Sequence, residues 1–171
     1  MSSLTDNILN RMSHIRTFLF DVDGVLTDGS LIISAQGELL RTMNAKDGLA
    51  MRTALNEGYE IIIITGGDSQ AVMKRLKGLG IQEVYLAQHD KLKKYRSLAE
   101  EKGWKKGTVL YMGDDLNDIE IMGAADIATC PEDAVHEIQT ISDYISPYKG
   151  GKGCVRDVIE KVLRLNDHWL A

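Results

Sequence analysis

Short apolar runs alternate with segments of helical periodicity along most of the chain. The apolar runs that predict strands cover residues 17–20, 60–64, 83–86, 108–112, 126–128 and 143–145. Apolar residues recur at helical spacing between them, near residues 47–57, 69–78, 90–102, 116–123, 132–139 and 152–165. Nearly continuous apolar strands that alternate with helices are typical of a parallel sheet covered on both faces. The pattern therefore predicts an α/β fold with a doubly wound, Rossmann-like, mostly parallel sheet flanked by helices.

Capping residues support several of these predicted helix starts. Asp68 and Ser69 precede the second helical segment, and Asp90 opens the third. Short polar side chains at these positions can accept hydrogen bonds from the free N–H groups of the first helical turn. We expect the sequence Pro-Glu-Asp at residues 131–133 to start the fifth helix in the same way.

One segment, at about residues 30–43, breaks the alternation of strand and helix. Two apolar arms flank the sequence Ala-Gln-Gly-Glu at residues 35–38, and glycine at such a turn predicts a β-hairpin inserted after the first strand. Leu31, Ile33 and Leu39 would be exposed on this hairpin. An apolar, projecting edge of this kind associates with another surface unless it is covered. We predict that the hairpin is a contact between subunits.

Composition and charge restrict the class of protein. The chain has 171 residues, of which 44% are apolar and 26% charged, and its length predicts one domain over residues 1–171. The net charge of −5 disfavours binding to nucleic acid or to an anionic membrane. No apolar run approaches the roughly 20 residues of a membrane span, and the N-terminus does not resemble a signal peptide, so we expect a cytoplasmic protein. Cys130 and Cys154 stand alone, which predicts buried core residues rather than a disulfide framework.

Candidate site residues come after four of the predicted strands, at the edge where open α/β sheets bind ligands. They are Asp21 and Asp23 after the first strand, Thr65 and Gly66 after the second, Lys91 after the third, and Asp114, Asp115 and Asp118 after the fourth. Clustered carboxylates raise one another's pKa unless a cation is bound. Mg²⁺ is a hard cation that prefers oxygen ligands, whereas zinc is disfavoured because no His or Cys lies among these residues. We therefore predict a magnesium site.

These side chains suit phosphoryl transfer. Asp21, the first residue out of its strand, is placed to attack phosphorus and form an aspartyl-phosphate. Asp23 can protonate the leaving oxygen and then deprotonate water. Thr65 and nearby backbone N–H groups can bind phosphoryl oxygens, and Lys91 can neutralise their charge. Each residue alone also fits an ordinary turn, cap or helix start, but the four together in this order favour chemistry.

The ordered motifs DxDG, Thr65, Lys91 and GDxxxD, within residues 17–118, resemble those of the haloacid dehalogenase-like superfamily of phosphotransferases. The resemblance implies that Asp21, the backbone carbonyl of Asp23 and Asp114 hold Mg²⁺. It also implies that Asp118 supports the site, with Asp115 as a neighbour. The intervals between motifs are too short for a separately folded cap, so we expect a capless enzyme with an open site.

A wider set of segments resembles the capless phosphatases of 3-deoxy-D-manno-octulosonate 8-phosphate, a family of lipopolysaccharide precursor synthesis. These segments read DVDGVLTDG, NAKDG, ITGG, GIQEVYLAQHDKL, GDDLND and GGKGCVRDVIEKVL. The resemblance implies a homotetramer whose hairpins associate around the symmetry axis. It also implies that a flexible, glycine-rich segment at about residues 147–153 folds over an active site.

The substrate of that family is a phosphorylated sugar acid, so cations beyond the metal are required. We expect Gly66, Lys46, Arg75 and Lys152 to bind it, with Arg75 suited to the sugar carboxylate. The chain departs from the family pattern twice: Gly67 stands where many relatives have arginine, and Lys46 replaces an arginine and cannot offer a bidentate fork.

Because both departures affect substrate selection, alternative functions remain open. The nearest is a phosphatase of a nine-carbon keto-deoxy sugar acid 9-phosphate. A phosphomutase is a second, which the absence of a cap disfavours. A non-catalytic assembly module is a third, and the complete set of motif residues argues against it.

Overall fold

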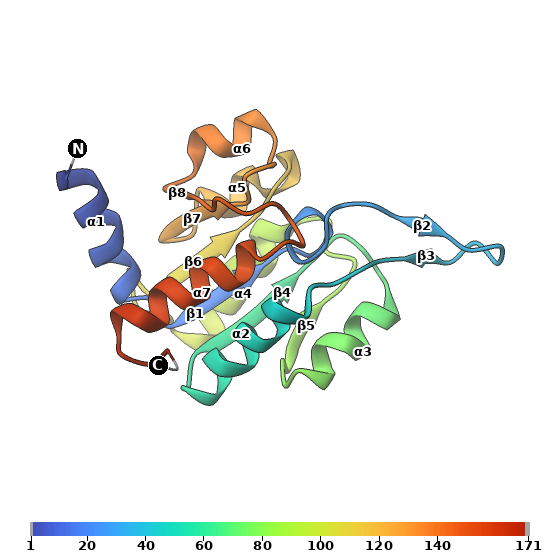
Figure 1. Cartoon of the computed structure of the whole chain (residues 1–171), viewed down its shortest axis with the longest axis horizontal. Helices are drawn as coiled ribbons and strands as arrows, with labels where there is room; N and C mark the ends of the chain where they lie inside the picture. Colours follow the sequence, from blue (N-terminus) through green and yellow to red (C-terminus); the bar gives the residue numbers. More distant parts are fainter. Residues whose placement is uncertain (1, 170–171) are drawn as a thin grey trace.

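A computed structural model describes residues 2–169, with side chains from residue 7 onward, and its centre is one parallel sheet (Figure 1). The strands are β1 (Thr17–Phe20), β4 (Glu60–Ile64), β5 (Glu83–Tyr85), β6 (Val109–Met112), β7 (Ile127–Cys130) and β8 (Tyr144–Ile145). Their order is β5-β4-β1-β6-β7-β8, and every neighbouring pair is parallel. The predicted doubly wound α/β fold is confirmed. The chain winds outward from β1 in both directions, so the order reverses next to β1, where such folds bind ligands.

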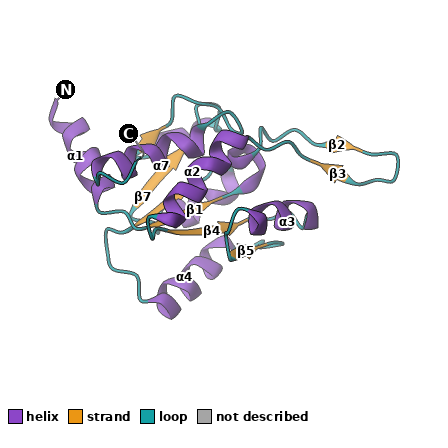
Figure 2. Cartoon of the chain, turned by 60° about the horizontal axis from the view of Figure 1, so that its bottom comes forward, coloured by secondary structure: helices purple, strands orange, loops and turns teal. Residues whose placement is uncertain are grey.

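Helices cover both faces of the sheet (Figures 1 and 2). One face carries α1 (Ser2–Ser13), α2 (Ala45–Asn56), α3 (Gln70–Gly78) and α7 (Cys154–Leu165). The other carries α4 (Lys91–Lys102), α5 (Ile119–Met122) and α6 (His136–Ile141). Successive strand residues point to opposite faces, so Phe18 and Phe20 join the first core and Leu19 the second. Two buried cores fix the sheet, and with it the residues at the strand ends.

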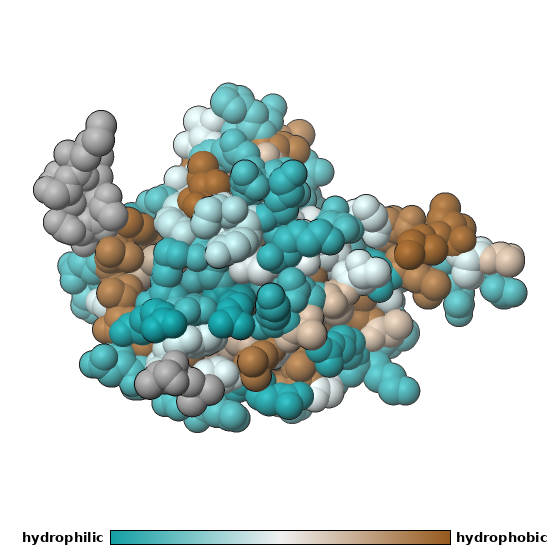
Figure 3. All heavy atoms as spheres, in the orientation of Figure 1, coloured by the Kyte–Doolittle hydropathy of each residue, from teal (hydrophilic) through white to brown (hydrophobic). Residues whose placement is uncertain are grey.

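The inserted hairpin is present and projects from the body of the molecule (Figure 2). Its strands, β2 (Ile32–Ile33) and β3 (Leu39–Leu40), pair antiparallel. All four of these residues are exposed, Ile33 by 72% of its surface, and apolar atoms gather on the hairpin in Figure 3. The apolar edge predicted from the sequence is therefore real, and no separate cap domain lies between β1 and α2.

The structure differs from the predicted elements at two places. The sequence does not predict helix α1, because most of its residues are polar and only a few apolar ones, such as Met12, pack onto the core. The expected helix start at residues 131–133 is wrong: α6 begins at His136, and its N-cap Val135 makes no side-chain capping bond. Ser69 and Asp90 do cap α3 and α4. None of the described helices is long and apolar enough to cross a membrane.

The glycine-rich segment before α7 packs against the loop that follows β1. Gly151 N–H donates to the carbonyl of Val25 at 2.9 Å, and Lys152 pairs with Asp28 at 3.2 Å. A Cβ on Gly150 would overlap the carbonyl oxygen of Gly24, so only glycine allows this approach. The flexibility of this segment and the single-domain organisation stay predictions.

Candidate active site

The turn after β1 places two carboxylates at the edge of the sheet. Asp21 follows Phe20 directly, is buried, and accepts a hydrogen bond from its neighbour Val22 N–H at 2.6 Å. The chain then forms a wide helical turn, η1 (Val22–Leu26), whose backbone is not helical at Asp23 and Gly24. Gly24 has φ +85°, and a Cβ there would overlap Asp114 Oδ2. The glycine of the DxDG motif therefore lets the turn after β1 touch the carboxylate that follows β6.

A buried ion-pair network lies behind this turn. Lys91, at the first turn of α4, is 3% exposed, and its Nζ lies 2.6 Å from both Asp21 Oδ2 and Asp118 Oδ1. Asp118 ends the short helical turn η2 (Leu116–Asp118) and is fully buried. Its Oδ1 also accepts from the hydroxyl of Tyr111, and its Oδ2 from Asp114 N–H at 3.0 Å. Every oxygen of Asp118 is thus in use, which makes it an anchor for Lys91 and for the loop after β6.

The carboxylate of Asp114, unlike that of Asp118, is not held by hydrogen bonds in the described structure. It accepts no hydrogen bond from any residue whose side chain the structure describes, although it is half-buried. Burial, followed by the charges of Asp21, Asp118 and Asp115, raises the pKa of Asp114 to about 8. Burial also raises the pKa of Asp21 to about 6, against the lowering effect of Lys91. A cation bound between Asp21 and Asp114 would lower both pKa values, so the two carboxylates suit a positively charged ligand.

The donor atoms fit a magnesium ion. Carboxylate oxygens of Asp21, Asp114 and Asp118 all lie within 4.8 Å of one another. They are hard oxygen ligands, and no His or Cys belongs to this group. Each Asp118 oxygen accepts two hydrogen bonds, whereas each Asp21 oxygen accepts one and the Asp114 carboxylate accepts none from the described side chains. Asp21 and Asp114 are therefore the side chains that keep lone pairs for a cation.

Added Mg²⁺ should therefore stabilise the protein more at pH 8.5 than at pH 6. Because the folded pKa of Asp114 lies above its unfolded value of 3.8, the folded state binds more protons than the unfolded state between about pH 4 and 8. Stability without metal falls as pH rises through that window, and Mg²⁺ then neutralises the ionised carboxylate. We expect the melting temperature to rise with Mg²⁺ by several degrees more at pH 8.5, measured by calorimetry.

Asp114→Asn is the control for this experiment. It removes the ionisable group, so the fall in stability between about pH 6 and 8 and most of the Mg²⁺ effect should disappear, whereas the fall below pH 6 that comes from Asp21 should remain. An equal Mg²⁺ effect at both pH values in the wild type, or an undiminished effect in Asp114→Asn, would contradict a metal bound by ionised Asp114.

The acidic cluster opens into a pocket of about 340 Å³. The pocket is lined by Asp21, Asp23, Gly24, Gly29, Thr65, Gly66, Gly67, Asp114, Asp115 and Asn117. Thr65 follows β4 and is buried, and its hydroxyl oxygen accepts from Gly67 N–H at 3.2 Å. Residues from three neighbouring strands thus meet in one concave site, with Lys91 held behind it.

Known proteins resemble this chain over nearly its whole length. A 3-deoxy-D-manno-octulosonate 8-phosphate phosphatase of Yersinia pestis is 33% identical over 164 residues, which are 96% of this chain and 88% of that protein. The phosphatase of the same name from Escherichia coli K12 is 34% identical over 92% of this chain and 84% of that one. The family model of haloacid dehalogenase-like hydrolases matches residues 78–159. The chain belongs to the haloacid dehalogenase-like hydrolases. It is a phosphoric monoester hydrolase, as the motifs predicted.

Solved structures of this hydrolase family share the fold. The crystal structure of the Yersinia pestis phosphatase superposes with a TM-score of 0.92, at 33% identity, over 95% of this chain and 88% of that one. A Moraxella catarrhalis 3-deoxy-D-manno-octulosonate 8-phosphate phosphatase has a TM-score of 0.91 at 33% identity, over 95% and 94% of the two chains. That crystal contains a magnesium ion, a phosphate ion and KDO.

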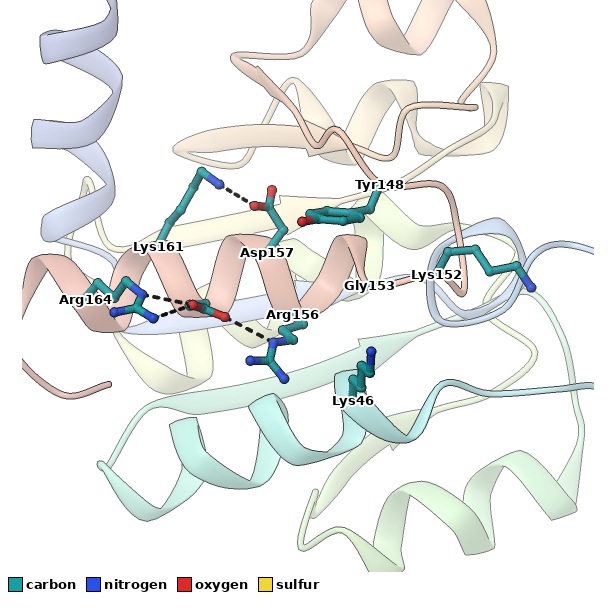
Figure 4. Close-up of a pocket in the computed structure, with 9 residues that line it drawn as sticks. Lys46, Tyr148, Lys152, Gly153, Arg156, Asp157, Lys161 and Arg164 are labelled. Atoms are coloured by element: carbon teal, nitrogen blue, oxygen red, sulfur yellow. Dashed lines mark hydrogen bonds and ion pairs between the residues drawn. The ribbon is translucent and has the colours of Figure 1, made fainter. Parts of the chain in front are cut away.

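Three of the cations predicted to bind substrate lie outside the acidic pocket of this hydrolase. Lys46 and Lys152 line a separate pocket of about 420 Å³ beside α7, where Lys46 points from α2 toward Arg156 (Figure 4). Arg75 is exposed on α3, and its Nη2 lies 2.9 Å from where a Cβ on Gly48 would be. Gly66 does line the acidic pocket. Roles for these four residues in substrate binding stay predictions.

Sequence reasoning missed one charged residue at the site. Arg41, which follows β3 on the return arm of the hairpin, pairs with Asp23 through two hydrogen bonds. Arg41 does not follow a strand of the main sheet, so the sequence at the strand ends does not indicate it. Asn117 was also not singled out, although it lies inside the GDDLND motif and lines the pocket.

Proposed function

We propose that the protein hydrolyses 3-deoxy-D-manno-octulosonate 8-phosphate to the sugar acid and inorganic phosphate. The observation that carries this proposal is the pocket in which Asp21, held by Lys91, faces Asp114, Thr65 and Gly66. Relatives with this activity in their names share a third of the sequence, and one of them binds Mg²⁺, phosphate and KDO together. The predicted cytoplasmic location is part of the same proposal.

The first step would be attack by an Asp21 carboxylate oxygen on phosphorus. The bond between phosphorus and the sugar oxygen breaks, and the sugar leaves as an alcohol after taking a proton from Asp23. The phosphoryl oxygens would accept hydrogen bonds from the Thr65 hydroxyl and from backbone N–H groups at Gly66. Lys91 keeps Asp21 ionised and oriented, because its Nζ lies 2.6 Å from Asp21 Oδ2.

The second step would hydrolyse the aspartyl-phosphate on Asp21. A water molecule gives its proton to Asp23 and attacks phosphorus, which breaks the bond to Asp21 and releases phosphate. Asp23 returns to its protonated form, and Asp21 to its carboxylate. One group with two roles therefore suffices for both proton transfers.

Asp21, Asp114 and the backbone carbonyl of Asp23 would hold Mg²⁺ at this site. A bound Mg²⁺ supplies positive charge to the phosphoryl oxygens and permits the carboxylates to stay ionised. Asp118 would act through Lys91 and the loop of Asp114, to which its oxygens are hydrogen-bonded. Asp115 lines the pocket, and its side chain accepts from Leu116 N–H, which suits a supporting role.

Phosphate release from a panel of substrates tests the proposal. The panel contains the eight-carbon 8-phosphate, a nine-carbon keto-deoxy sugar acid 9-phosphate and glucose 6-phosphate, each with Mg²⁺ and with EDTA. We expect the highest kcat/KM on the eight-carbon substrate and loss of activity in EDTA. A clear preference for the nine-carbon 9-phosphate would show that it, and not the eight-carbon 8-phosphate, is the substrate. No phosphate release from any member of the panel would overturn the proposed function.

We also propose that the hairpins associate in a homotetramer. The five apolar side chains exposed on and beside the hairpin strands carry this proposal: Leu31, Ile32, Ile33, Leu39 and Leu40. Ile33→Asp should shift the particle to a smaller mass, because a buried, unpaired charge opposes association. Light scattering after gel filtration measures the mass. Gln36→Asp, at the exposed turn of the hairpin, is the matched control and should leave the mass unchanged.

A further inference from the structure

Arg41 makes a two-pronged ion pair with Asp23. Its Nε lies 2.6 Å from Asp23 Oδ1, and its Nη2 lies 3.0 Å from Asp23 Oδ2. The third nitrogen, Nη1, donates to the carbonyl of Leu39 at 3.0 Å. The Arg41 side chain is only 8% exposed, although it comes from an arm of the projecting hairpin. A planar guanidinium with all three nitrogens engaged is fixed in orientation.

Asp23 depends on Arg41 for its orientation. Among the described side chains, its carboxylate accepts hydrogen bonds from Arg41 alone. Its backbone lies in the non-helical part of η1, and its side chain is 35% exposed. Without Arg41, nothing else in the described structure would hold the two oxygens of Asp23 at the mouth of the pocket.

Gly67 leaves room for this pair. A Cβ at Gly67 would lie 3.4 Å from Arg41 Nη2 and 3.5 Å from Asp23 Oδ2. A methyl group would fit at these distances, but a branched side chain would enter the space that the guanidinium fills. Gly67 and Asp23 both line the acidic pocket, whereas Arg41 is not among its lining residues and holds Asp23 from outside it.

We propose that Arg41 is a positioning residue, which orients the Asp23 carboxylate toward the substrate from the return arm of the hairpin. This inference rests on the proposed function, in which Asp23 protonates the leaving oxygen. The shorter hydrogen bond, from Arg41 Nε, fixes Asp23 Oδ1. The other oxygen, Asp23 Oδ2, would exchange the proton with the substrate. The hairpin thereby contributes to catalysis within its own chain.

The dependence on the leaving group tests this role. A sugar or alkyl phosphate needs a proton on its leaving oxygen, whereas p-nitrophenolate leaves without one. Arg41→Ala should lower kcat/KM for the sugar phosphate by about 10- to 100-fold, a part of the 10²–10⁴ that general acid catalysis supplies. The same variant should lower kcat/KM for p-nitrophenyl phosphate less than about threefold. Arg41→Lys keeps the charge but not the two-pronged geometry, so its kcat/KM for the sugar phosphate should lie between those of the wild type and Arg41→Ala.

A double-mutant cycle completes the test. If Arg41 acts through Asp23, Arg41→Ala should have no further effect on the sugar phosphate in the Asp23→Asn background. Gly67→Val, which displaces the guanidinium, should reproduce the selective loss of Arg41→Ala. Arg52→Ala removes an exposed arginine of α2 and should match the wild type on both substrates.

The outcomes separate this inference from the proposed function. A wild-type protein without activity on any phosphate ester overturns the proposed function itself. With an active wild type, equal losses on the two substrates would show that Arg41 binds the phosphoryl group, and no loss would show that it is dispensable. An additive double mutant would also overturn the positioning role. Retained activity of the Arg41 variants on p-nitrophenyl phosphate excludes misfolding as the cause of a selective loss, and melting temperatures near that of the wild type exclude it for an equal loss.

Discussion

Asp21→Asn should lower the rate of phosphate release by at least about 10⁴-fold at saturating substrate, the loss typical when a nucleophile is removed. Asparagine is almost isosteric and can still accept a hydrogen bond from Lys91. It lacks the negative charge and the second oxygen that attack phosphorus and form the aspartyl-phosphate. Steady-state kinetics and a rapid-quench measurement of labelled phosphate on the protein would record both losses.

The fold should survive this substitution. The introduced amide has one oxygen, which can accept from Lys91 or from Val22 N–H but not from both. It also relieves the repulsion between Asp21 and Asp114, which offsets this loss, so the melting temperature should change little. Glu120→Gln, an exposed carboxylate on α5, is the matched control and should retain full activity. Turnover by Asp21→Asn within tenfold of the wild type would exclude Asp21 as nucleophile.

The parts of the fold that follow from local pattern were predictable. The inner strands β1, β6 and β7 are fully buried and mostly apolar, because a parallel strand covered on both faces has no polar side. The motif residues were predictable for a related reason: the carboxyl ends of parallel strands share an edge. Asp21, Thr65 and Asp114 therefore had to meet, whatever the lengths of the intervening helices.

The contacts made across the sequence were not predictable in the same way. Arg41 reaches Asp23 only because the hairpin arm returns past the turn after β1, and no periodicity encodes that path. Three predicted substrate cations are near the motifs in sequence but do not line the acidic pocket. Lys46 and Lys152 line the pocket beside α7, and Arg75 lies next to Gly48. Gly113 belongs to a motif that the sequence shows, but only the structure gives the reason for the glycine. A Cβ there would lie 2.5 Å from Asp118.

Lys91→Met should lower both stability and activity, because it leaves two buried carboxylates without their shared cation. Methionine has nearly the volume of lysine, so packing is preserved and the charge is the quantity tested. Breaking a buried ion pair from one side destabilises proteins by roughly 3–5 kcal/mol. For a chain of this length that corresponds to a fall of about 10 °C in melting temperature. In the folded wild type, burial opposes the charge of Lys91, but Asp21 and Asp118 outweigh burial and raise its pKa.

The stability lost in Lys91→Met should depend on pH with a definite sign. Without Lys91, the pKa of Asp21 rises further above its unfolded value, so the folded variant binds a proton that the unfolded chain releases. The loss should therefore be smallest near pH 5 and should grow toward pH 8. Lys93→Met, two residues further along α4 and exposed, is the control and should show neither the loss nor its pH dependence. A loss independent of pH would mean that Lys91 stabilises the fold by packing rather than by charge.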